Sequence, residues 1–181
     1  MSTLYVDNLQ PNLGSKVEIP DLKPLAGAVV QVVQGSYGDA TVVNSTTYTS
    51  IGLSVNITPT STSSKILISY DVHAAAYGGS ESAHLRIYRD STSVYVGNTR
   101  GSRTPATSAV GGDASSSAIY MQSNTYLDSP STTSQITYEI KCRSYDGGGG
   151  NQAYVNRSYT DSNFSSIPSV VSTITVMEIA Q

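Results

Sequence analysis

Apolar and polar side chains alternate along most of the chain after about residue 26. In segment 136–143, every even position is Ile, Tyr or Cys and every odd position is Thr, Glu, Lys or Arg. Segment 66–73 repeats the pattern, with Ile, Ile, Tyr and Val on one face. A period of two places successive side chains on opposite faces of a strand. These segments are therefore predicted to be half-buried β-strands.

About nine such segments follow one another, with turn signals roughly every ten residues. The predicted strands are Ala28–Gln34, Thr46–Ile57, Ile66–His73, Ala83–Arg89, Ser93–Asn98, Ala118–Leu127, Ile136–Arg143, Gln152–Tyr159 and Val170–Ile179. Gly35–Asp39 is expected to be a turn, and Thr99–Ser117, which has no periodicity, a long functional or disordered loop. No segment predicts a helix. The spacing predicts an all-β fold, an antiparallel, jelly-roll-like β-sandwich of eight or nine strands.

The first 25 residues differ from this pattern. They contain Pro11, Pro20 and Pro24, each of which favours an extended conformation in the residue before it. Their apolar residues recur at gaps of two to four but are too few to form a core alone. We therefore interpret residues 1–25 as an extended arm that docks on another subunit or protein, and residues 26–181 as a sandwich head. The alternative is a frayed terminus. The candidate docking residues are Leu4, Tyr5, Val6, Leu9, Leu13, Val17, Ile19, Leu22 and Leu25.

Composition narrows the function classes. The chain has 181 residues, a net charge of −3 and only 10 Lys plus Arg, which argues against a nucleic-acid partner. No segment approaches the roughly 20 apolar residues of a membrane span, so no membrane insertion is expected. The N-terminus lacks the basic region of a signal peptide. Ser and Thr, 30 and 19 residues, make up 27% of the chain. We expect these hydroxyls to cover the solvent faces of the strands.

Candidate chemistry is sparse. The only histidines, His73 and His84, end one predicted strand and begin the next, so they could be hairpin neighbours. Two histidines could begin a metal site, but no third ligand is visible at metal spacing, so two polar strand residues are the favoured reading. The single Cys142 lies on the apolar face of its strand and is expected to be a buried hydrophobe. Acidic residues are scattered, so a paired-carboxylate glycosidase site is not indicated. No cofactor is expected.

Aromatic and basic residues near predicted loops are the best candidates for surface contact. Tyr has an apolar ring and a polar end, which suits binding surfaces. The alternative is that Tyr replaces the missing Trp and scarce Phe within strands. The candidate contact residues are Tyr77, Arg100, Arg103, Tyr145, Asp146, Tyr154 and Tyr159.

The segment STLYVDNLQPNLGSKVEIP resembles the N-terminal arm of tailed-phage virion proteins, especially those of marine and cyanobacterial phages. The rest resembles the C-terminal module of such proteins. Four pieces carry this resemblance: Gly27–Gln34 (GAVVQVVQ), Ile57–Leu67 (ITPTSTSSKIL), Leu127–Pro130 (LDSP) and Val171–Ile179 (VSTITVMEI). In strand plan the module is similar to the trimeric jelly rolls of the tumour-necrosis-factor and C1q kind.

The resemblance implies a non-enzymatic virion structural protein, a homotrimer docked on other capsid or tail proteins through residues 1–25. It implies a location on the virion after assembly in the host cytoplasm. Only about Asp21–Ala26 separates arm from head, which leaves no room for a shaft. This suits a short fibre or knob, or a capsid decoration or head-fibre protein. The exposed loops would then be candidates for contact with a host-surface glycan or protein. The alternative is a virion-associated polysaccharide-degrading or carbohydrate-binding protein.

Overall fold

The protein folds as a β-sandwich. The computed structural model describes residues 24–78, 81–146 and 152–181, and every regular element among them is a strand. The eleven strands are β1 (Val29–Tyr37), β2 (Thr41–Val43), β3 (Thr49–Ile57), β4 (Lys65–Ala76), β5 (Ser82–Arg89), β6 (Thr92–Val94), β7 (Ser108–Gly111), β8 (Tyr120–Asp128), β9 (Ile136–Ser144), β10 (Ala153–Val155) and β11 (Ser172–Ile179). None of the described residues form a helix that could cross a membrane.

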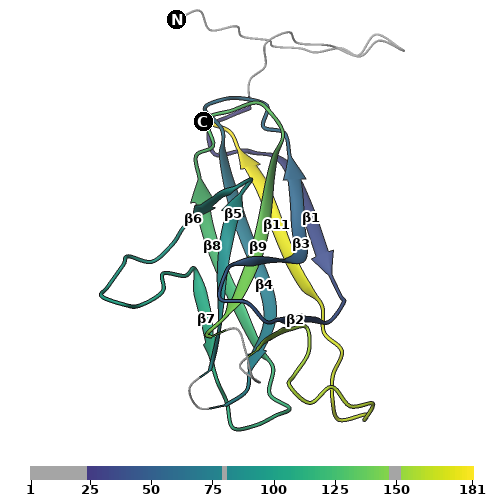
Figure 1. Cartoon of the computed structure of the whole chain (residues 1–181). Helices are drawn as coiled ribbons and strands as arrows, with labels where there is room; N and C mark the ends of the chain where they lie inside the picture. Colours follow the sequence, from purple (N-terminus) through teal and green to yellow (C-terminus); the bar gives the residue numbers. More distant parts are fainter. Residues whose placement is uncertain (1–23, 79–80, 147–151) are drawn as a thin grey trace, which may run out of the picture.

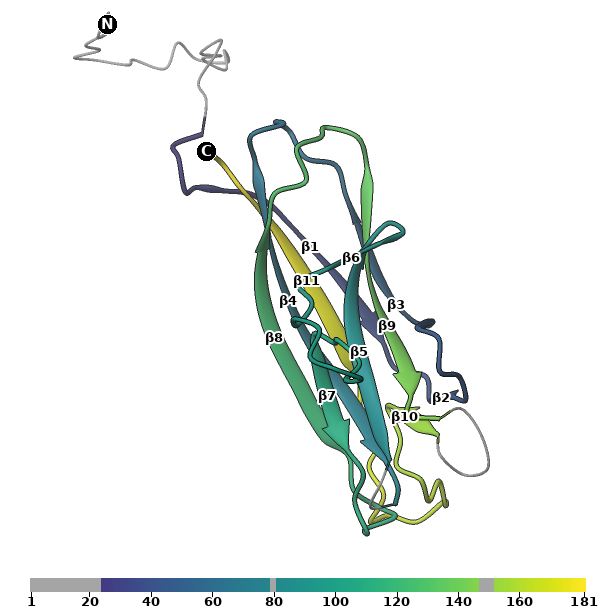
Figure 2. The same ribbon diagram turned by 60° about the vertical axis from the view of Figure 1, so that its left-hand side comes forward.

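Two antiparallel sheets face each other (Figures 1 and 2). Sheet A has the order β1-β11-β4-β10-β2, and β8 pairs with the other side of β4. Sheet B has the order β3-β9-β5-β6, and β7 also pairs with β5. Each sheet takes strands from both halves of the chain. This interleaving is that of a jelly roll, so the predicted fold class is confirmed.

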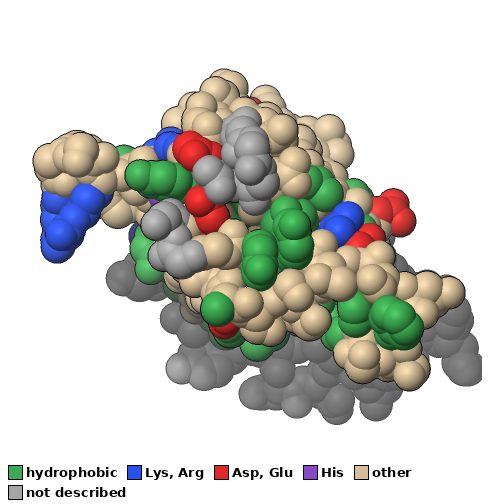
Figure 3. All heavy atoms as spheres, turned by 60° about the horizontal axis from the view of Figure 1, so that its bottom comes forward, with side chains coloured by type: hydrophobic (Ala, Val, Ile, Leu, Met, Phe, Trp, Pro, Cys, Tyr) green, Lys and Arg blue, Asp and Glu red, His purple; other side chains and the backbone are tan. Residues whose placement is uncertain are grey.

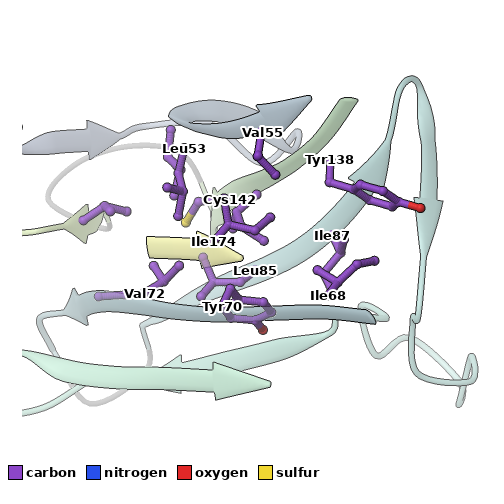
Figure 4. Packing of buried hydrophobic residues seen from close by; sticks show 14 of the residues in the cluster. Leu53, Val55, Ile68, Tyr70, Val72, Leu85, Ile87, Tyr138, Cys142 and Ile174 are labelled. Carbon is purple, nitrogen blue, oxygen red and sulfur yellow. The ribbon is translucent and has the colours of Figure 1, made fainter. Parts of the chain in front are cut away.

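The core lies between the sheets and consists of the inward residues of the alternating strands. Figure 4 shows Leu53 and Val55 from β3 directed toward the residues that β4 and β11 contribute from sheet A, such as Val72 and Ile174. Cys142 is fully buried in this core, as expected, and burial raises the pKa of its thiol to about 12. Truncating one such aliphatic side chain to Ala typically destabilises a protein by about 2–5 kcal/mol.

The strands differ from the sequence prediction in several places. The predicted strands Ser93–Asn98 and Gln152–Tyr159 are shorter in the structure, where β6 ends at Val94 and β10 at Val155. Residues 35–37 belong to β1 and not to a turn. A side chain at Gly35 would collide with the backbone carbonyl of Ser54. Gly35 thus lets β1 run past β3 where the sheets approach each other. The segment 99–117 contains β7, and β2 was also missed. Both strands are four residues or shorter, too short to show periodicity.

Two buried carboxylates close one end of the core. Asp128, at the end of β8, accepts a hydrogen bond from the hydroxyl of Tyr138 at 2.6 Å and forms an ion pair with Arg89 at 2.8 Å. Asp128 comes from sheet A, and both partners come from sheet B. Burial raises the pKa of Tyr138, and the Asp128 carboxylate raises it further. The interaction therefore ties the sheets together at this edge.

Glu178 is fully buried at the end of β11. Its carboxylate accepts hydrogen bonds from Gln31 Nε2 at 2.6 Å and from the amide and hydroxyl of Thr60 at 2.8 and 2.7 Å. Burial acts to raise the pKa of Glu178, but these bonds and one from Ser64 outweigh it, and the net shift is downward. Donors from β1 and from the segment between β3 and β4 thus meet on one charged group.

We predict that Asp128→Ala destabilises the fold by about 3 kcal/mol, because it leaves Arg89 and the buried Tyr138 hydroxyl without their acceptor. Glu139→Ala is the matched control. Glu139 pairs with Lys141 on an outer face at 3.3 Å, and such pairs contribute about 0–1 kcal/mol. Urea denaturation measures both free energies of unfolding. Equal effects for the two variants would contradict the role assigned to Asp128.

Candidate surface-contact site

The sandwich has two unlike ends (Figure 1). At one end, which we call the arm end, the first described residues lead into β1 and the chain finishes. There Gly27 and Ala28 exchange backbone hydrogen bonds with Ala180. At the other end, the loop end, lie the connections after β4, β7 and β10. Leu25 is the only predicted docking residue among the described residues, and its side chain is 83% exposed. The other docking residues of the arm lie outside the described residues.

Three of the predicted contact tyrosines come together at the loop end. The rings of Tyr77 and Tyr159 stack with centroids 4.2 Å apart and planes at 14°. Tyr154 meets Tyr159 edge to face at 5.8 Å. Such pairs add about 0.5–1.5 kcal/mol beyond burial. Tyr154 is 2% exposed and forms the buried part of the cluster, whereas Tyr159 is 43% exposed.

Asn156 sets the position of Tyr159. Its backbone has a φ of 57°, a left-handed conformation that Asn tolerates better than most residues. Its buried amide nitrogen donates to the carbonyls of Tyr37 and Asp39, and its oxygen accepts from Ser172 at 2.6 Å. The chain therefore leaves β10 in a fixed direction.

Arg157 continues this support. It donates to the carbonyls of Ser158 and Tyr159 and pairs with Asp161 at 3.2 Å. Figure 3 views the molecule from the loop end and shows hydrophobic side chains in several groups, with acidic side chains beside some of them.

The other predicted contact residues lie along the outer side of sheet B. The connection between β6 and β7 is held there by the carbonyl of Pro105, which accepts from Tyr48 at 3.0 Å and from Arg86 at 2.9 and 2.5 Å. Arg100 and Arg103 are exposed on this connection. Tyr48, Arg86 and Arg157 were not among the predicted contact residues, because nothing in their local sequence marks them.

A shallow hollow of about 420 Å³ lies between this connection and the start of β5, lined by Ser82, His84, Ser102, Arg103, Thr104 and Tyr145. Tyr145 is anchored by its carbonyl, which accepts from Arg143 at 2.6 Å. Burial lowers the pKa of His84, and the nearby guanidinium groups of Arg143 and Arg86 lower it further. His84 is therefore neutral near pH 7.

Asp146 is exposed just beyond Tyr145. Burial raises the pKa of Glu81, and the charge of Asp146 raises it further. Arg103 lines the hollow, and the carboxylates of Glu81 and Asp146 belong to the sequence neighbours of its lining residues Ser82 and Tyr145.

The two histidines do not meet as hairpin neighbours. β4 continues to Ala76 and belongs to sheet A, whereas β5 belongs to sheet B, so His73 and His84 lie on different sheets. Within the part of the chain that the structure describes, no group of three or more His, Cys, Asp or Glu side chains is arranged to hold a metal ion.

No protein-family profile matches the sequence, and no curated protein is similar to it in sequence. Among solved structures, a chain from "Structure of infectious bursal disease virus Gx strain" is similar in shape, with 12% identity and a TM-score of 0.45. The match covers 95% of this chain and 42% of the viral chain, so this protein spans less than half of that chain's length.

We predict that lowering the pH from about 7.5 to about 5.5 decreases the free energy of unfolding, partly through His84. The unfolded chain binds a proton at His84 with a pKa of about 6.5, above the lowered folded value, so acid favours unfolding. His84→Gln should decrease the slope of the unfolding free energy against pH, by an amount that corresponds to less than one proton. Urea titrations across this range measure it, and identical slopes for the two proteins would refute the prediction.

Proposed function

We propose that this chain is a non-enzymatic structural protein of a tailed-phage virion, anchored by residues 1–25 and presenting the loop end outward. It assembles as a homotrimer and forms a short fibre or knob, or a capsid-surface decoration. Three copies linked in one trimer bind through three arms, which increases the effective concentration at the docking site.

The division between the two ends of the sandwich carries this proposal. Residues 24–28 leave the sandwich at the arm end, so the preceding arm is attached far from the loop end. A sandwich bound through that arm therefore directs its tyrosine cluster and longest loops away from the docking site. Host-surface glycans or proteins suit this surface, because tyrosine rings combine apolar area with a hydroxyl.

The pieces that resemble phage proteins support the same division. Gln31, Thr60 and Glu178 belong to three of those pieces, and Gln31 and Thr60 both donate hydrogen bonds to the Glu178 carboxylate. The fourth piece supplies Asp128. All four therefore contribute polar contacts that close the arm end. The candidate contact loops lie outside all four pieces.

Two locations on the virion suit this arrangement, the tail and the capsid surface. Immunogold labelling of purified particles distinguishes them.

The alternative from a different class is a polysaccharide-degrading enzyme. Its catalysis needs two carboxyl groups facing one cleft. The buried carboxylates of Asp128 and Glu178 already accept the bonds that close the arm end. We expect no reducing ends to accumulate when the protein is incubated with host polysaccharide. Their accumulation would replace the structural proposal with the enzymatic one.

Deleting residues 1–22 should leave a folded, soluble sandwich, because the core is built from residues 43–180. The truncated protein should no longer be incorporated into virions when it replaces the full chain during phage production. Circular dichroism checks the fold, and immunoblotting of purified particles measures incorporation. Undiminished incorporation of the truncated protein would disprove the docking role of the arm.

A further inference from the structure

Four apolar side chains form a continuous row on the outer face of sheet A. The strand register pairs Val32 with Met177, Met177 with Leu67, and Leu67 with Leu127, across β1, β11, β4 and β8. Val32 is 56% exposed and Leu127 is 45% exposed. Val29 and Ile179 pair directly beside the row and extend it toward the arm end. We call these six residues the apolar row.

A sandwich usually has apolar residues on its inner face and polar residues on its outer face, and next to the apolar row this arrangement is reversed. The neighbouring residues on the inner face form the row Gln31, Glu178, Ile66 and Asp128. Three of these four inner residues are polar, and both carboxylates need the hydrogen bonds described above. The apolar side chains of the same stretch therefore point outward, and Val29, Val32 and Leu127 are exposed.

The remainder of this face is nearly uncharged. The next two rows are Gln34, Thr175, Ser69 and Thr125, and then Ser36, Thr173, Asp71 and Ser123. Lys65, which pairs with Ile179 beside the apolar row, and Asp71 are the charged residues that β4 contributes to this face, and their charges are opposite. A face of this kind can line a threefold axis, where it meets the equivalent faces of two other copies, without repulsion between like charges. Depletion of charged residues is typical of interface cores.

The edge strands of sheet A, β1 and β8, lack the residues that usually prevent sheets from associating. β1 and β8 are nine residues long and have no Pro and no charged residue on the outer face; their one charged residue, Asp128, points into the core. Edge strands of monomeric proteins usually carry such residues, which prevent association through the sheet. Sheet B contrasts with this, because its outer face carries Arg86, Glu139, Lys141 and Arg143, and Arg86 holds the β6–β7 connection over it.

We infer that the outer face of sheet A is the surface through which copies of this chain associate, with the apolar row at its centre. The inference rests on the homotrimer proposed above and names the surface that forms it. A second copy is the occupant that the balanced charge and the unguarded border strands favour. The cluster of tyrosines at the loop end lies away from this surface and stays accessible in the assembly.

The test measures the mass of the full-length chain and of two variants, Val32→Lys and Leu127→Lys, by light scattering at one micromolar-range concentration. The wild-type chain should have about three times its mass of 19.0 kDa, and both variants should have the mass of one chain. A lysine at the row places a charge in an apolar contact, which costs far more than at an open surface. Both positions are exposed in the single chain, so each variant should fold, as circular dichroism will check.

Ser54→Lys is the matched control. Ser54 is exposed on the outer face of sheet B, and this variant should keep the wild-type mass. If the lysine variants at the row keep the mass of the wild-type oligomer, this surface is wrong while the proposed virion role stands. If the wild-type chain is a monomer, the surface and the trimer both fail. If deletion of residues 1–22 alone produces a monomer, the arm and not a second sandwich covers the row, and the inference fails.

Discussion

The structure depends on the burial of one face of each sheet against the other. The described part of the chain contains no helix, and its one cysteine is a buried thiol, so the sheets are held by side-chain packing and by a few polar contacts. Apolar burial at roughly 25 cal/mol per Å² is the dominant stabilising term in such a fold. Because the inner positions are reserved for packing, the outer positions are free to vary, and Ser and Thr fill many of them.

This constraint explains why the arm end is unusual. The core is closed at this end by two buried carboxylates, and each accepts hydrogen bonds from other segments of the chain. Asp128 joins the two sheets, and Glu178 collects donors from β1 and from the connection before β4. Inward and outward side chains alternate along these strands at the arm end as well. Polar residues therefore occupy the inner positions there, and apolar residues occupy the neighbouring outer positions. The closed end of the core and the apolar row are thus two consequences of one register.

The main strands and the sandwich could be predicted from the sequence, because alternation and turn residues are local signals. The short strands β2 and β7 could not, since three or four residues carry no periodicity. The extension of β1 through Gly35 was also missed, because the need for a glycine there comes from the backbone of β3. The tyrosines of the loop end could be singled out, but not their grouping. Tyr77 and Tyr159 are 82 positions apart and meet only in three dimensions. Likewise, Val32, Leu67, Leu127 and Met177 form a row only once the strand register is known.

The most direct test of the central proposal is the position of this protein in an intact phage particle, determined by electron cryomicroscopy. The account predicts three copies around a threefold axis, with residues 1–25 buried in another virion protein and the loop end facing outward. A particle in which the loop end faces the capsid or tail, or in which the protein is absent, would contradict it.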